Sequence, residues 1–242
     1  MIGIFDSGVG GFTVLRALRD RLPSADVIYF GDTKNAPYGN RSREEIVTLT
    51  EHAFALLRRE GATGIVSACN SVSVTLALPL ASERVAEMVG PTVRALAGTT
   101  QRIGLCATVA TIDSGIYQTA FAAVGKEIEA FSIPQLAGAI EAGEPTDEIV
   151  ANALRGTEET FDLLILACTH YPFARESFRK ALPQVELFDP ALPVAEQVAR
   201  AWGDGEEGTG TTRFIISRES AVFRSRAERL FPEGGQTVEV LE

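Results

Sequence analysis

The sequence predicts an α/β protein made of two similar doubly wound parallel-sheet lobes, related by pseudo-two-fold symmetry, with the active site between them. Short apolar runs alternate with helix-length segments along the 242 residues, a pattern typical of parallel sheets covered by helices. The run at 1–7 has a counterpart at 102–108, and the run at 64–67 has one at 163–166. Because both pairs are about a hundred positions apart, we interpret the chain as a duplicated α/β unit.

The repeat also predicts how the chain divides into lobes. We expect the first lobe to comprise residues 1–95 plus 208–242, and the second to comprise residues 96–207. The polar, glycine-rich segment 203–210 would bring the chain back to complete the first lobe.

Individual elements follow from apolar periodicity and from helix-capping patterns. Ser42, followed by Glu45 three positions later, forms a capping-box pattern at the start of a helix over 42–59. Gly90-Pro91 is expected to mark a boundary between elements. Strands are expected at 2–5, 27–30, 64–67, 102–108, 129–131, 163–166, 213–216 and 237–241. Further helices are expected at 12–21, 72–88 in two pieces around Pro79, 112–124, 134–142, 146–155, 175–182, 191–202 and 221–230.

Composition narrows the class of partner. A net charge of -10 argues against nucleic acid and anionic membranes as general partners, because both need clustered Lys and Arg. No apolar run reaches the roughly 20 residues that span a bilayer, and no export signal is recognised at the N-terminus. Three cysteines without such a signal indicate free thiols in a reducing compartment. The two histidines, His52 and His170, do not form a metal-binding pattern.

Two of the cysteines carry the strongest functional signal. Cys69 and Cys168 each follow a buried strand, at the edge where open α/β sheets hold ligands. Two thiols from similar lobes could act on opposite faces of one carbon, one removing a proton and the other delivering one, without metal or cofactor. Cysteine is also a common small apolar residue at buried strand ends, and this is our interpretation of Cys106.

Short polar side chains surround both thiols. They can be helix N-caps, or they can donate hydrogen bonds to a substrate carboxylate, and their convergence on one sheet edge favours the ligand. Asp6 either stabilises the glycine turn over 6–11 or contacts a substrate ammonium and tunes Cys69. His170 could tune Cys168. The short polar residues are Ser7, Asn70, Ser71, Ser73, Thr108, Thr111 and Thr169.

The glycine turn does not match a nucleotide-binding motif. Asp-Ser-Gly-Val-Gly-Gly at 6–11 fits neither the dinucleotide pattern nor a phosphate-binding P-loop with its Lys-Ser/Thr end. No cofactor is therefore expected.

Five blocks together resemble the bacterial glutamate racemases of the cofactor-independent aspartate/glutamate racemase superfamily. The resemblance extends from residue 2 to about residue 230, with the blocks in the same order and at similar spacing. The blocks are Asp6–Gly11, Gly31-Asp32 with Pro37-Tyr38-Gly39, Ala68–Ser71, Thr108–Thr111 and Cys168–Pro172.

The resemblance implies interconversion of L- and D-glutamate for peptidoglycan by a cytoplasmic enzyme that is commonly a homodimer. It implies that Cys69 acts on the D-enantiomer and Cys168 on the L-enantiomer, with help from Asp6, His170 and the carboxylate Glu141. Further substrate contacts are implied at Ser7, Pro37, Tyr38, Gly39, Asn70, Ser71, Thr108, Thr111 and Thr169.

The chain departs from the family pattern in two respects. Ser71 stands where the family usually has threonine, which keeps the hydroxyl. No extension precedes Asp6, so we expect no activation by a cell-wall precursor. Three alternatives remain open: a racemase for aspartate or another amino acid, a single-thiol decarboxylase, and a non-catalytic α/β ligand-binding protein.

Overall fold

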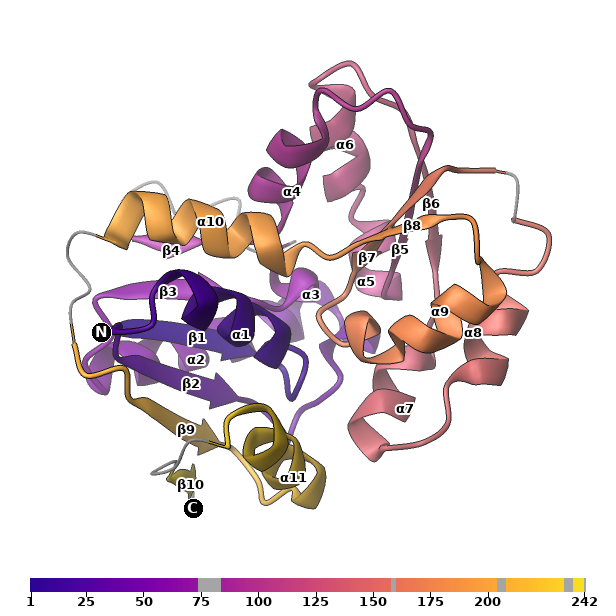
Figure 1. Ribbon diagram of the computed structural model, residues 1–242. Helices are drawn as coiled ribbons and strands as arrows, with labels where there is room; N and C mark the ends of the chain where they lie inside the picture. The colour runs from indigo at the N-terminus through magenta and orange to yellow at the C-terminus, as the bar shows by residue number, and fades with distance from the viewer. Residues whose placement is uncertain (74–83, 158–159, 204–207, 233–236, 242) are drawn as a thin grey trace.

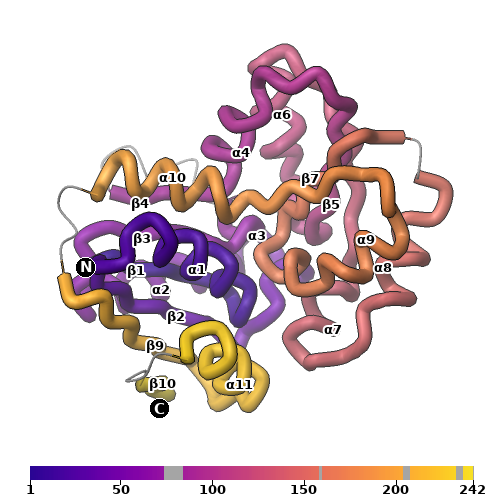
Figure 2. The backbone as a smooth tube through the Cα atoms, viewed as in Figure 1, coloured from indigo at the N-terminus to yellow at the C-terminus, as the bar shows by residue number. Residues whose placement is uncertain are grey.

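The computed structural model contains two parallel β-sheets with helices packed around them (Figures 1 and 2). One sheet has the strand order β10-β9-β2-β1-β3-β4 and the other β6-β5-β7-β8. The predicted α/β class is confirmed. The structure describes residues 1–73, 84–157, 160–203, 208–232 and 237–241. The strands are β1 Ile2–Asp6, β2 Val27–Gly31, β3 Gly64–Ser67, β4 Val85–Ala86, β5 Ile103–Ala107, β6 Ile128–Ser132, β7 Leu163–Ala167, β8 Glu186–Phe188, β9 Thr212–Ile216 and β10 Val238–Val240.

Helices connect these strands, and most lie close to the predicted ranges. The α-helices are α1 Phe12–Arg21, α2 Arg43–Arg59, α3 Asn70–Ser73, α4 Val89–Leu96, α5 Val109–Asp113, α6 Ile116–Ala122, α7 Leu136–Ala142, α8 Asp147–Ala153, α9 Arg175–Ala181, α10 Ala191–Trp202 and α11 Ala221–Leu230. The described residues also form the short 3-10 helices η1 Tyr38–Asn40 and η3 Tyr171–Ala174.

Four strands of the six-stranded sheet have the same order as the four strands of the other sheet. In the first, β1 pairs with β2 on one side and β3 on the other, and β4 follows β3; in the second, β5 pairs with β6 and β7, and β8 follows β7. The strand order changes direction between β1 and β3, and again between β5 and β7. At such switch points the carboxyl ends of neighbouring parallel strands leave a crevice for a ligand.

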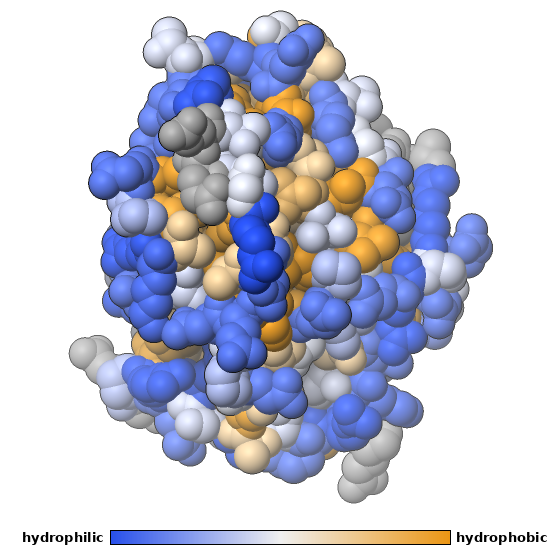
Figure 3. All heavy atoms as spheres, turned by 90° about the vertical axis from the view of Figure 1, so that its right-hand side faces the viewer, coloured by the Kyte–Doolittle hydropathy of each residue, from blue (hydrophilic) through white to orange (hydrophobic). Residues whose placement is uncertain are grey.

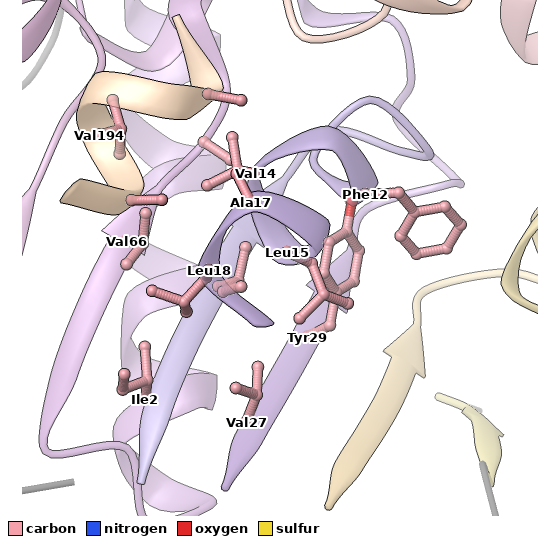
Figure 4. Close-up of a cluster of buried hydrophobic side chains, with 14 of the residues drawn as sticks. Ile2, Phe12, Val14, Leu15, Ala17, Leu18, Val27, Tyr29, Val66 and Val194 are labelled. Carbon is pink, nitrogen blue, oxygen red and sulfur yellow. The ribbon is translucent and has the colours of Figure 1, made fainter. Parts of the chain in front are cut away.

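Helix α2 packs on one face of the six-stranded sheet, and a larger core cluster lies between the other face, α1 and α10. Figure 4 shows Val14, Leu18 and Val194 among the side chains of this cluster. Each of these three side chains is no more than 1% exposed. Helix α10 was expected in the second lobe, but its apolar face belongs to this cluster and Figure 1 shows it beside the six-stranded sheet. The physical reason is that α10 is amphipathic and α1 offers an apolar surface to cover it.

Aromatic rings of the same cluster connect the C-terminal segment to the start of the chain. Phe214 on β9 lies 5.6 Å from Phe12, 5.8 Å from Tyr29 and 5.8 Å from Phe223 on α11, measured between ring centroids. All four rings are fully buried. Aromatic packing of this kind fixes β9 and α11 against the helix that follows the glycine turn.

Some element predictions are confirmed and others are wrong. Ser42 and Glu45 form the predicted capping box of α2. The single helix expected at 112–124 is broken into α5 and α6 at Gly115, whose φ of 64° is left-handed. Gly90-Pro91 lies at the predicted boundary, because β4 ends at Ala86 and Pro91 is in the first turn of α4, where a missing N–H costs no helical bond.

The helix expected at 72–88 is confirmed at its described start, where α3 covers Asn70–Ser73, and is wrong near its end, where the short strand β4 occupies Val85–Ala86. Residues 74–83 lie outside the described part of the chain. Within the described part of the chain no helix has the length and apolar character needed to cross a bilayer. On the face seen in Figure 3, apolar side chains gather near the middle and polar side chains surround them.

Replacing Phe214 with alanine should destabilise the protein by about 3–5 kcal/mol, because a fully buried ring would leave a cavity among the aromatic side chains. Equilibrium urea unfolding measures this loss. Val240→Ala, on the neighbouring strand β10 at 38% exposure, should change the free energy of unfolding by less than about 0.5 kcal/mol. Equal effects of the two substitutions would contradict the role given to the aromatic group.

Candidate active site

The carboxyl ends of four central strands position the predicted site residues. Strand β1 ends at Asp6, β3 is followed by Cys69, β5 by Thr108 and β7 by Cys168. These four residues and Ser7 are each no more than 5% exposed. The site is therefore buried, and each sheet contributes one thiol to it.

Cys69 lies beside the glycine turn of the first sheet. Its Sγ is 3.7 Å from Oγ of Ser7 and donates to it. Burial raises the pKa of Cys69 to about 12, and the nearby charges of Asp6 and Cys168 act in the same direction, against the hydrogen bond to Ser7. Cys69 is thus a protonated thiol at neutral pH and can deliver a proton.

Cys168 has a cationic partner. Its Sγ lies 3.7 Å from Nδ1 of His170, whose Nε2 lies 2.6 Å from Oε1 of Glu141. Burial lowers the pKa of His170, but its hydrogen bonds to Cys168 and Glu141 outweigh burial and hold that pKa well above 6.5. The imidazole is therefore protonated at neutral pH and places a proton donor beside Cys168.

Glu141, on α7, joins this arrangement to the glycine turn. Its Oε1 accepts a hydrogen bond of 2.7 Å from the N–H of Val9 as well as the contact from His170. Burial raises the pKa of Glu141, but the hydrogen bond and charge of His170 and the Val9 N–H together lower it. A Cβ at Gly8 would lie 1.8 Å from this oxygen, so only glycine leaves room for the carboxylate.

Asp6 makes the corresponding contacts from the first sheet. Its Oδ1 accepts from the N–H of Gly8 at 2.9 Å, and its Oδ2 accepts from the Thr169 hydroxyl at 2.9 Å. Tyr29 supports the same turn by donating to the carbonyl of Gly8 at 2.7 Å. Both carboxylates therefore connect the glycine turn to the segment after β7.

A chain of hydroxyl groups connects the sheets on the other side of the site. Oγ of Ser71 lies 2.9 Å from Oγ1 of Thr108, which lies 3.1 Å from Oγ1 of Thr111. Gly39 packs against Thr108 so closely that a Cβ there would lie 2.4 Å from the Thr108 Cβ. Ser71 makes its contact with Thr108 through its hydroxyl group, which a threonine at position 71 would also have.

The loop at 37–39 is anchored to the first sheet by hydrogen bonds through Asp32. Pro37 precedes η1, and the buried side chain of Tyr38 donates its hydroxyl to Oδ2 of Asp32 at 2.6 Å. Asp32 also accepts from Ser217, after β9, at 2.5 Å. The Tyr38 hydroxyl therefore holds the loop in place, while Gly39 brings the backbone to Thr108.

Two contacts at this site were not foreseen from the sequence. Tyr117, on α6, donates to Oδ1 of Asn70 at 2.6 Å, and Asp32 organises the loop that follows β2. Asp32 lay in a recognised block but had no assigned role, and nothing in the sequence around Tyr117 marks it. Cys106 donates to the carbonyl of Ile165 and is fully buried, as expected for a core thiol.

Among the described residues, no group of three His, Cys, Asp or Glu side chains is arranged to hold a metal ion. Ser7, Ser71, Thr108, Thr111 and Thr169 offer neutral hydroxyl donors instead. Fold and site together define an α/β protein with acid–base groups on both sides of one buried site.

Comparison with known proteins gives the family. The Asp/Glu/hydantoin racemase family model matches residues 13–198. The glutamate racemase of Desulforudis audaxviator is 36% identical over 253 residues, covering 93% of this chain and 92% of that protein. The crystal structure of a Bacillus anthracis glutamate racemase isoform has a TM-score of 0.88 at 30% identity, covering 100% of this chain and 97% of the other. That of the Francisella tularensis glutamate racemase in complex with D-glutamate has a TM-score of 0.88 at 28% identity, with the same coverage. The chain belongs to the Asp/Glu/hydantoin racemase family.

Glu141→Gln should lower the pKa of His170 toward its ordinary value, because it removes the charge that favours the imidazolium. The raised pKa of His170 stabilises the folded protein fully at pH values below 6.5, and this contribution is lost as the pH rises through the raised pKa. The lowered pKa of Glu141 stabilises the folded protein fully at pH values above 4.5, and this contribution is lost as the pH falls through the lowered pKa. The variant should therefore lose most stability, about 1–3 kcal/mol, between these two pH values, and less on either side. NMR titration of the imidazole and urea unfolding across pH measure the two effects.

Glu144→Gln is the matched control, because Glu144 lies just beyond the same helix and is exposed. It should leave the His170 titration unchanged. An equal loss of stability at every pH in Glu141→Gln would contradict the ion pair.

Proposed function

We propose that the protein is a glutamate racemase that interconverts L- and D-glutamate by proton transfer through Cys69 and Cys168. The observation that carries this proposal is the pair of buried thiols after β3 and β7, which are corresponding strands because β2-β1-β3-β4 has the same order as β6-β5-β7-β8. Family membership and the glutamate racemases among its relatives support the choice of substrate.

In the proposed reaction with L-glutamate, the Cys168 thiolate removes the α-proton, and the C–H bond is replaced by an S–H bond. The Cys69 thiol then delivers its proton to the opposite face, and a new C–H bond forms with inverted configuration. The raised pKa of Cys69 supports its role as the acid in this direction. The reverse reaction exchanges the two roles.

Electrostatics around the thiols support the assignment of helpers. His170, held by Glu141, is placed to exchange a proton with Cys168, and Asp6 lies close enough to raise the pKa of Cys69. The substrate carboxylates would accept hydrogen bonds from neutral donors, so their charge is retained without a buried lysine or arginine. These donors are Ser7, Asn70, Ser71, Thr108, Thr111 and Thr169, with Pro37, Tyr38 and Gly39 forming the adjoining wall.

The lobe division is part of the proposal. We infer two lobes that meet at the thiols. The chain would cross between them first between β4 and α4, whose apolar residues pack with the second sheet, and again near residue 190, where α10 begins to pack on the six-stranded sheet. Family membership further supports a homodimeric cytoplasmic enzyme that supplies D-glutamate for peptidoglycan. Light scattering of the purified chain tests the dimer.

Cys69→Ala and Cys168→Ala should each reduce racemisation of glutamate by at least about 10²–10⁴-fold, because each variant lacks the acid or base for one face. Circular dichroism of L- and D-glutamate, followed in D2O together with α-deuterium by NMR, measures inversion and exchange. Cys106→Ala is the matched control, since that thiol is buried outside the site, and it should keep turnover.

Racemisation retained in either site variant would overturn the two-thiol mechanism. If the unaltered protein inverts aspartate but not glutamate, the two-thiol mechanism stands and aspartate, rather than glutamate, is the substrate. Neither exchange nor inversion with either acid would overturn the racemase proposal and favour a decarboxylase or a ligand-binding protein.

A further inference from the structure

A hydrogen bond between the two sheets determines which way the amide of Asn70 faces. Asn70 follows Cys69 on the side of the first sheet, and Tyr117 lies on α6, whose apolar residues pack with the second sheet. The Tyr117 hydroxyl donates to Oδ1 of Asn70 at 2.6 Å, and the two residues are 0% and 2% exposed.

The other end of the same amide is unsatisfied. Nδ2 of Asn70 is buried and has no hydrogen-bond partner in the described part of the chain. A buried donor without a partner is unfavourable, and such groups mark places where a ligand completes the bonding. Because the amide is planar, fixing Oδ1 on Tyr117 turns both N–H bonds away from that hydroxyl.

The tyrosine can hold this orientation across the working pH range. Burial, together with the charge of Glu87, raises the pKa of Tyr117 above its ordinary value, so the hydroxyl keeps its proton. A hydroxyl whose proton goes to Oδ1 favours one of the two amide orientations. Without that hydroxyl, rotation by 180° would present Oδ1 instead of the NH2 group, and an oxygen would repel a carboxylate.

We propose that Tyr117 is a positioning residue that holds the Asn70 amide with its NH2 group toward a carboxylate of the substrate. This inference rests on the proposed function of the site and adds the residue that sets the polarity of one of its donors. Asn70 makes the contact with the substrate, and Tyr117 acts only through Asn70.

Tyr117→Phe tests the proposal because it keeps the ring and removes only the hydroxyl. We expect KM for both glutamate enantiomers to rise about tenfold, with kcat changed less than about threefold, since the lost interaction binds substrate rather than the transferred proton. The Kd of D-glutamate, measured by calorimetry, should rise by a similar factor. A thermal unfolding scan confirms that the variant is folded.

A double-substitution cycle separates positioning from general stability. If Tyr117 acts through Asn70, the pair Tyr117→Phe with Asn70→Ala should have the KM of Asn70→Ala alone. Tyr171→Phe is the matched control, because within the described residues that buried hydroxyl bonds to the backbone carbonyls of Ala107 and Ile133, at 2.9 and 3.0 Å, and not to Asn70. Any effect of Tyr171→Phe on KM should be additive with the effect of Asn70→Ala.

An unchanged KM in Tyr117→Phe, or effects of Tyr117→Phe and Asn70→Ala that simply add, would overturn the positioning role. These outcomes are distinct from failure of the proposed function. In that case the unaltered protein would not invert glutamate at all, and the Kd comparison would still report whether Tyr117 controls the Asn70 amide.

Discussion

The site depends on two carboxylates that are buried where the sheets meet. A buried charge is tolerated only when hydrogen bonds or an opposite charge compensate for lost water. Glu141 is compensated by the Val9 N–H and protonated His170, and Asp6 by the Gly8 N–H and the Thr169 hydroxyl. Each carboxylate therefore links the turn after β1 to the second sheet, which fixes the positions of both thiols.

The duplication gives the two thiols equivalent places but unequal surroundings. Cys69 lies near the carboxylate of Asp6 and keeps its proton, whereas Cys168 lies beside a protonated imidazole. The repeated strand order thus places one thiol after a corresponding strand of each sheet, while the charged neighbours distinguish the two thiols. In the proposed racemase, this asymmetry sets which thiol starts as the acid.

Packing far from the thiols keeps the glycine turn in place. Phe12 follows the turn directly and lies against Phe223, 4.7 Å away between ring centroids, so the C-terminal helix α11 supports the start of α1. Tyr29 joins the same aromatic group and holds the Gly8 carbonyl. The C-terminal helix α11 therefore helps to hold the glycine turn, although it supplies neither thiol.

The sequence alone determined the α/β class, the repeat, most strands and the capping box of α2, because apolar periodicity and capping are local properties. It also placed Asp6, Cys69, Thr108 and Cys168 at strand ends, where parallel topology forces convergence. Tertiary structure alone decided that α10 covers the six-stranded sheet and that Tyr117 reaches Asn70. These contacts join elements far apart in the chain, and their distance and direction depend on how the two sheets meet. No local pattern of residues encodes that geometry.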